Sequence, residues 1–205
     1  MKRQMKRHMK RCLLLIPFAL TLLTACAGQP MKYYTLLAPP AAAPGTAEAI
    51  WVDLMPVSVP VQVDAPQLVV RQGSGQLALL EREQWAGPLD AEIRDALAAE
   101  LAQRAGVRDA HTLAAPRGAA LYRLKLDVQR FDSIPGRAVH WEAAWSLNGT
   151  GEQGLSLACG FRLTEPVGAG YPAMIEGHQR VIAKLAAQIA AVLDAVKGGA
   201  APGCG

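Results

Sequence analysis

Cys26 is the residue whose type and position point most directly to chemistry. It lies in the stretch LLTACAGQP at 22–30, after six Lys and Arg residues within positions 1–11 and an uncharged run at 12–24. That run is too short to cross a bilayer as a helix, which takes about 20 apolar residues. A basic start, a short apolar run and a small-residue exit are typical of a secretory signal peptide. The small residues around Cys26 resemble a bacterial lipobox, in which the cysteine receives a diacylglyceryl group and an N-acyl group.

This motif predicts where the protein works. Residues 1–25 would be the signal peptide and 26–32 a lipidated tether, and several acyl chains hold a protein stably on a membrane. Ala27 is the expected sorting residue, because an aspartate there would resemble the signal for retention in the inner membrane. We therefore expect the mature protein to lie on the periplasmic face of the outer membrane. The alternative is a plain secretory signal in which Cys26 is incidental.

The net charge changes once the signal is removed. Six of the 21 Lys and Arg residues lie in 1–25, which leaves 15 against 17 Asp and Glu. The basic character of the whole chain therefore comes from the signal peptide. A basic surface for nucleic acid has no support in the mature chain.

The motifs that resemble catalytic or cofactor signatures lie in the wrong context. The GTGEQG stretch at 149–154 matches a dinucleotide-binding fingerprint, but that fingerprint needs a strand before it and a helix after it. Here it falls between two expected strands. The mature histidines, His111, His140 and His178, lack the paired spacing of a zinc site. We expect no catalytic residue, no metal and no cofactor beyond the acyl groups on Cys26.

Two other cysteines remain after the signal is removed, in a compartment that favours disulfides. Cys159 falls in the inward register of an expected strand, whereas Cys204 lies near the end of the chain. A bond between them would draw the tail into the core. We therefore favour a buried, free Cys159 over a disulfide, since free cysteine packs as a small hydrophobe.

The elements that would carry these residues follow from periodicity. Alternating apolar residues predict three consecutive strands at 121–131, 138–147 and 154–164. A hairpin is expected at 67–83, and prolines place the extended segment 50–64 at a sheet edge or a bend. Helices are expected at about 88–105 and 173–197, each with one apolar face. The prediction is an α+β fold over 33–197, with both helices on one face of a largely antiparallel sheet. A short strand is expected at 33–37, an Ala/Pro-rich loop at 38–49 and a disordered tail at 198–205.

Several stretches together resemble a known family. EREQWAGPLDAEIRDALAAELAQ at 81–103, LDVQRFDSIPGRAVHWEAAWSL at 126–147, YYTL after the tether and QLVVRQGSGQLAL are similar to those of the ABC-type transport auxiliary lipoproteins (PqiC/YmbA-like). The resemblance implies an accessory subunit of lipid transport systems with an MCE-domain partner in the periplasm, which support outer-membrane integrity. It also implies a fold related to the TolB N-terminal type and no active site.

Five residues are candidates for contact with a partner protein. Trp85 and Leu89 stand at the entrance of the first helix, where packing is favoured over partner contact. Ser133, Pro135 and Arg137 belong to a turn that could present a contact surface, which a homo-oligomer could repeat. A regulatory or structural lipoprotein acting on cell-wall synthesis is the alternative function. A lipid-handling enzyme is the third, although it lacks an evident nucleophile, base and metal ligands.

Overall fold

The structure is a computed structural model that describes residues 29–39, 49–150 and 154–204. The chain divides into two compact units, Met1–Met31 and Lys32–Gly205, and all described elements belong to the second. Cys26, Ala27 and nearly all of the Ala/Pro-rich loop lie outside the described residues. The elements, in chain order, are β1 (Lys32–Tyr34), β2 (Ile50–Leu54), β3 (Gln67–Arg71), β4 (Leu77–Trp85), α2 (Leu89–Ala105), β5 (Val107–Asp109), β6 (Leu121–Ile134), β7 (Ala138–Thr150), β8 (Ser156–Pro166) and α3 (Tyr171–Lys197).

The larger sheet has five strands in the order β5-β2-β6-β7-β8. The antiparallel pairs β6–β7 and β7–β8 confirm the three predicted consecutive strands. Leu124, Leu126 and Trp145 face the core, as their alternation predicts. The segment 50–64 differs from its prediction, because β2 lies inside the sheet, parallel to both β5 and β6. The prolines of this segment come after β2 has ended. The predicted bend is therefore correct, and the predicted position at a sheet edge is wrong.

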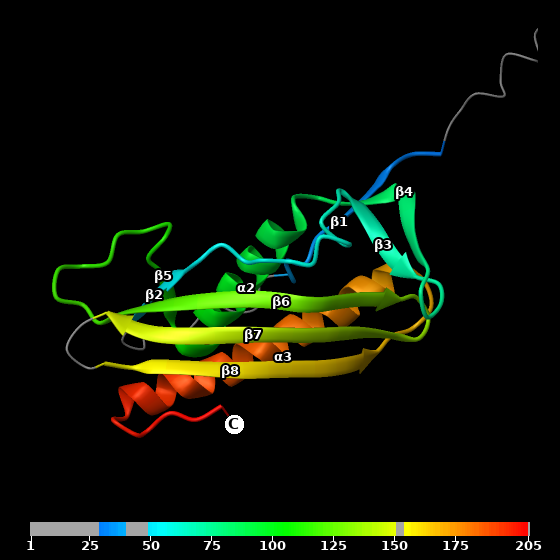
Figure 1. Cartoon of the computed structure of the whole chain (residues 1–205). Coiled ribbons are helices and arrows are strands. Elements are labelled where there is room, and N and C mark those ends of the chain that lie inside the picture. The colour runs from blue at the N-terminus through cyan, green and yellow to red at the C-terminus, as the bar shows by residue number, and fades with distance from the viewer. Residues whose placement is uncertain (1–28, 40–48, 151–153, 205) are drawn as a thin grey trace, which may run out of the picture. The chain divides into compact units, whose positions relative to one another are not determined.

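Both helices cover the same face of this sheet, behind β6, β7 and β8 in Figure 1. In α2, Ile93, Leu97 and Leu101 are fully buried, which confirms the predicted apolar face. The helix ends at Gly106, whose φ of 62° is the left-handed cap that glycine favours. In α3, the buried face includes Ile182, Leu185 and Ile189. No helix within the described residues is long and apolar enough to cross a membrane.

A second, smaller sheet has the order β1-β4-β3. Strands β3 and β4 form the predicted hairpin around the turn at Gly73–Gly75, and β1 pairs parallel to β4. The fold is α+β as predicted, but it contains two mixed sheets, in which most paired residues are antiparallel. The smaller sheet lies beside the end of β6 (Figure 1), where Arg71 bonds to Asp132.

An irregularity in β6 decides which side chains face the core at its end. Val128 pairs with Ala143, whereas Arg130 pairs with Glu142, so Gln129 is an extra residue in β6. An extra residue shifts the alternation by one position. After Gln129 the odd-numbered Phe131 and Ser133 are therefore buried, while Arg130 turns to the uncovered face.

Cys159 and Cys204 are joined by a disulfide, with their Cα atoms 5.5 Å apart. The expectation of a free Cys159 is therefore wrong. Cys159 belongs to β8, the outermost strand, so the tail reaches it from the side without entering the interior. Gln188 accepts a hydrogen bond from the Trp145 indole and donates one to the Cys204 carbonyl. The tail that was expected to be disordered is thus tied to β8 and α3 at Cys204.

Candidate functional site

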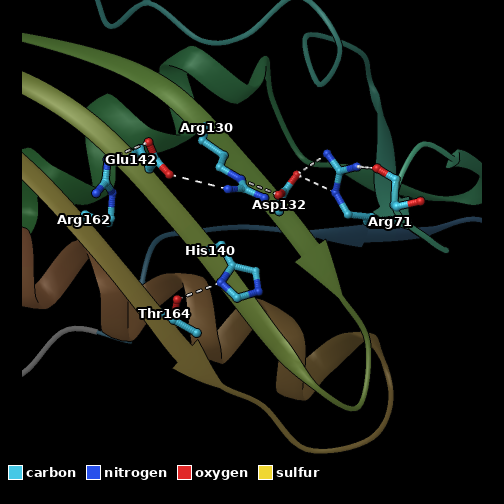
Figure 2. Close-up of polar contacts among 8 residues, drawn as sticks. Arg71, Arg130, Asp132, His140, Glu142, Arg162 and Thr164 are labelled. Atoms are coloured by element: carbon cyan, nitrogen blue, oxygen red, sulfur yellow. Dashed lines mark hydrogen bonds and ion pairs between the residues drawn. The ribbon is translucent and has the colours of Figure 1, made fainter.

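The uncovered face of the larger sheet carries a row of charged side chains at the end where β6 meets the β3–β4 hairpin. Figure 2 shows Arg71 and Arg130 on either side of Asp132, with Glu142 and Arg162 continuing the row across β7 and β8. Arg71 comes from β3, 61 residues before Asp132, whereas the other residues come from the consecutive strands β6, β7 and β8. The fold, rather than a local motif, assembles this group.

Asp132 is the centre of the group and is almost wholly buried. One carboxylate oxygen accepts hydrogen bonds from Arg71 Nε (2.9 Å) and Nη2 (2.6 Å), and the other accepts one from Arg130 Nε at 2.6 Å. Burial opposes ionisation of Asp132, but the hydrogen bonds from both arginines outweigh it and lower its pKa. Asp132 is therefore held as a carboxylate that fixes two guanidinium groups side by side.

The outer part of the row is held more loosely. Glu142 pairs with Arg130 Nη1 at 3.5 Å and with Arg162 Nη2 at 3.3 Å. The Arg162 side chain is 79% exposed. Exposed ion pairs of this kind contribute at most about 1 kcal/mol. They set the charge of the face more than they stabilise the fold.

A shallow hollow of about 500 Å³ opens beside this row. Polar side chains that line it include Arg71, Arg137, His140 and Thr164, together with Ser74 of the hairpin turn. The His140 Nδ1 atom lies 2.7 Å from the Thr164 hydroxyl oxygen, and Figure 2 shows the two side chains together on β7 and β8. Among the described residues, the Arg137 guanidinium and His140 Nε2 have no hydrogen-bond or ion-pair partner. The hollow thus combines bound and unbound donors.

Behind the sheet, a second polar group lies wholly within the core. His178 of α3 stacks on Phe131 with ring centroids 4.1 Å apart, and burial lowers its pKa to about 3. Its Nδ1 atom accepts a hydrogen bond from Trp141 Nε1 at 2.8 Å, so the proton of the neutral ring lies on Nε2. Nε2 lies 2.8 Å from Ser133 Oγ and therefore donates to it. A histidine that donates to a serine cannot take the proton from it, so this pair lacks the arrangement of a nucleophile and its base.

The structure moves most of the predicted contact residues into the core. Trp85 packs edge-on against Phe131, and Leu89 is buried at the start of α2, so both side chains pack in the core. Ser133 is only 2% exposed, so its assignment to a contact surface is corrected. The cause is the extra residue Gln129, which turns Ser133 towards α3. Pro135 is partly exposed and Arg137 is exposed, so these two remain at the surface.

Sequence reasoning missed Arg71, Asp132 and His140 as members of one group. Arg71 and Asp132 are 61 residues apart, and neither belongs to a motif with fixed spacing. No group of three or more His, Cys, Asp or Glu residues that could hold a metal occurs within the ranges that the structure describes.

Comparison with known proteins identifies the class. The chain belongs to the family of ABC-type transport auxiliary lipoprotein components, whose profile matches residues 34–190. No curated protein matches the chain.

Solved structures share the fold. A crystal structure of an uncharacterised protein is 24% identical with a TM-score of 0.64, and the match covers 79% of this chain and 97% of that one. A crystal structure from Xanthomonas campestris, of a protein in the DUF330 family, is 16% identical with a TM-score of 0.60. That match covers 82% of this chain and 98% of the other. At these identities the likeness concerns the fold alone.

Proposed function

We propose that the protein is a non-catalytic accessory subunit of an MCE-type intermembrane lipid transport system, anchored to the periplasmic face of the outer membrane through Cys26. The observation that carries the proposal is membership of the transport auxiliary lipoprotein family over residues 34–190. The lipobox-like stretch around Cys26 supports the anchor, and Ala27 supports the outer membrane.

A non-catalytic role agrees with the chemistry of the described residues. The Ser133–His178 pair is buried and has the proton on the nitrogen that faces the serine. The partly exposed His140 bonds to a threonine rather than to a carboxylate. Neither arrangement activates a nucleophile.

The length of the tether favours a partner that comes to this protein. Six residues from Ala27 to Lys32 span at most about 20 Å, and a domain of about 180 residues has a radius of gyration of roughly 16 Å. The domain therefore stays close to its membrane. A periplasmic MCE assembly would have to reach it, and the tip with Pro135 and Arg137 is the surface we assign to that contact. Several copies of the domain could surround such an assembly.

The test is photocrosslinking in the cell envelope. A photoreactive amino acid at Arg137 should capture a periplasmic MCE-domain protein, identified by mass spectrometry, whereas the same probe at Arg117 should not. Arg117 is an exposed arginine before the opposite end of β6, which makes it a matched control. Capture of a cell-wall synthase by the Arg137 probe would instead support the regulatory lipoprotein.

A further inference from the structure

The hollow beside Asp132 concentrates positive charge on a domain that has little net charge. Among the residues of the row and the hollow, four guanidiniums face two carboxylates. The cations are Arg71, Arg130, Arg137 and Arg162, and the anions are Asp132 and Glu142. The mature chain as a whole has more acidic than basic residues. The local excess of cations therefore belongs to this site and not to the general surface.

The Arg71 guanidinium in the hollow is preorganised by contacts within the folded protein. Arg71 uses two of its five N–H groups on Asp132 and a third on the Ser74 carbonyl at 3.3 Å, which leaves two unused. Asp132 is buried, and its hydrogen bonds from Arg71 and Arg130 lower its pKa despite the burial. It is therefore a carboxylate that holds the Arg71 guanidinium in place. The entropy of ordering Arg71 is thus lost on folding rather than on binding.

Two further polar side chains line the hollow, one from the turn after β6 and one from β7. Arg137 lines the hollow from the turn after β6 and has no partner among the described residues. His140 of β7 is oriented by Thr164 of β8, and its Nε2 atom is unbonded in the described structure. The unused groups therefore come from β3, from the β6–β7 turn and from β7. A tetrahedral phosphate accepts hydrogen bonds from several sides, whereas a planar carboxylate is served best by a single fork.

We propose that this hollow binds a phosphate group, as a free phosphate or as the phosphoester of a lipid headgroup, through Arg71, Arg137 and His140. Its volume of about 500 Å³ admits a phosphate with a small polar substituent. This inference does not rest on the proposed transport role, and a protein with either envelope function could carry the site.

The test measures binding of soluble probes to the lipidated mature protein in uncharged detergent. Inorganic phosphate and the diester glycerophosphoglycerol are titrated at constant ionic strength, with sodium chloride as the reference, and binding is followed by calorimetry. We expect saturable binding that Arg137→Ala weakens about tenfold, the effect of losing one charge-assisted contact. Arg117→Ala removes the same charge far from the hollow and should change the affinity less than twofold. His140→Ala should weaken binding as well.

The outcomes separate the two sources of phosphate. Tighter binding of the diester assigns the site to a lipid headgroup, and tighter binding of inorganic phosphate assigns it to the free ion. The proposal is overturned if Arg137→Ala binds like the parent protein, if Arg117→Ala weakens binding equally, or if neither probe binds more tightly than chloride. A negative result here leaves the crosslinking test of the transport role unaffected, because that test asks for a protein partner.

Discussion

His178 is a titratable residue whose role in this fold is structural. It is fully buried between Phe131, Trp141 and Ser133, and it satisfies polar atoms from two strands of the sheet. A buried indole N–H or hydroxyl without a partner would cost about 1–3 kcal/mol. The neutral imidazole provides an acceptor for the indole and a donor for the hydroxyl, so both groups are satisfied at once.

The first prediction concerns the response of His178 to pH. Its pKa is about 3 in the folded protein, against an ordinary value of 6.5. Between these values the unfolded state binds a proton that the folded state does not, so stability falls as the pH falls. The free energy of unfolding should drop by about 2 kcal/mol between pH 7 and pH 5 from this residue alone. Urea unfolding at a series of pH values measures it.

A matched variant isolates the histidine from the other groups that titrate. His178→Gln retains a donor and an acceptor but does not titrate, so its stability should be nearly flat from pH 7 to pH 5. The carboxylates of Asp132, Glu83 and Glu165, whose pKa values are all lowered in the folded protein, add a pH dependence only below about pH 5, where they begin to bind protons in the unfolded state. An equal slope in both proteins would show that His178 is not the source.

The sequence predicts some residue positions and not others for a definite physical reason. Alternation correctly places Val139, Trp141 and Trp145 in the core, because β7 pairs without interruption. It fails at Ser133 because one extra residue in β6 reverses the alternation, and no residue type in that stretch signals the extra position. The site around Asp132 depends on this reversal, and therefore could not be found from spacing.

At the scale of elements, Gly177 lets α3 lie close to β7 and to Val167, the residue after β8. A Cβ atom added there would lie 2.3 Å from Val167 Cγ1 and 3.4 Å from Val139 Cγ2. The helix could not pack at this distance with any larger residue. Periodicity predicts that α3 is a helix. It does not show whether Gly177 is needed for close packing or only lowers the helix propensity.

The second prediction follows from this close approach. Gly177→Ala should lower the free energy of unfolding by about 1 kcal/mol, because overpacking of about 1–3 kcal/mol exceeds the gain of about 1 kcal/mol in helix propensity. Val167→Ala removes the atom that would collide. The double variant should therefore be more stable than the sum of the two single changes predicts, and additivity within about 0.5 kcal/mol would argue against the collision.

The third prediction tests the disulfide between β8 and the tail. The bond closes a loop of 45 residues, and a loop of that size corresponds to about 4 kcal/mol in the chain-entropy account, as an upper value. Cys204→Ser should lower the melting temperature, and a reductant should lower that of the parent protein to the same level. The variant itself should not respond to reductant. A parent protein that is insensitive to reductant would mean that the bond does not form in solution.

At the scale of the whole molecule, the start of the domain is fixed firmly to its body. Glu83 accepts hydrogen bonds from Lys32 (3.1 Å) and Tyr34 (2.5 Å), which hold β1 on β4. Glu92 of α2 accepts from the Thr35 hydroxyl and the Leu36 N–H, at 2.7 and 2.8 Å. A lipid anchor at Cys26 would therefore act on a rigid attachment point, with only a short tether between them.

The fourth prediction concerns that anchor. Cys26→Ala should abolish incorporation of radiolabelled palmitate and leave the protein unprocessed or released from the outer membrane, because the acyl groups on Cys26 are the proposed anchor. Cys204→Ser is the matched control, since it removes a cysteine at the other end of the chain and should leave labelling and fractionation unchanged. A companion change, Ala27→Asp, should move the labelled protein towards inner-membrane fractions. Palmitate in Cys26→Ala would refute the lipobox, whereas labelled Ala27→Asp that stays in the outer membrane would refute only the sorting role of residue 27.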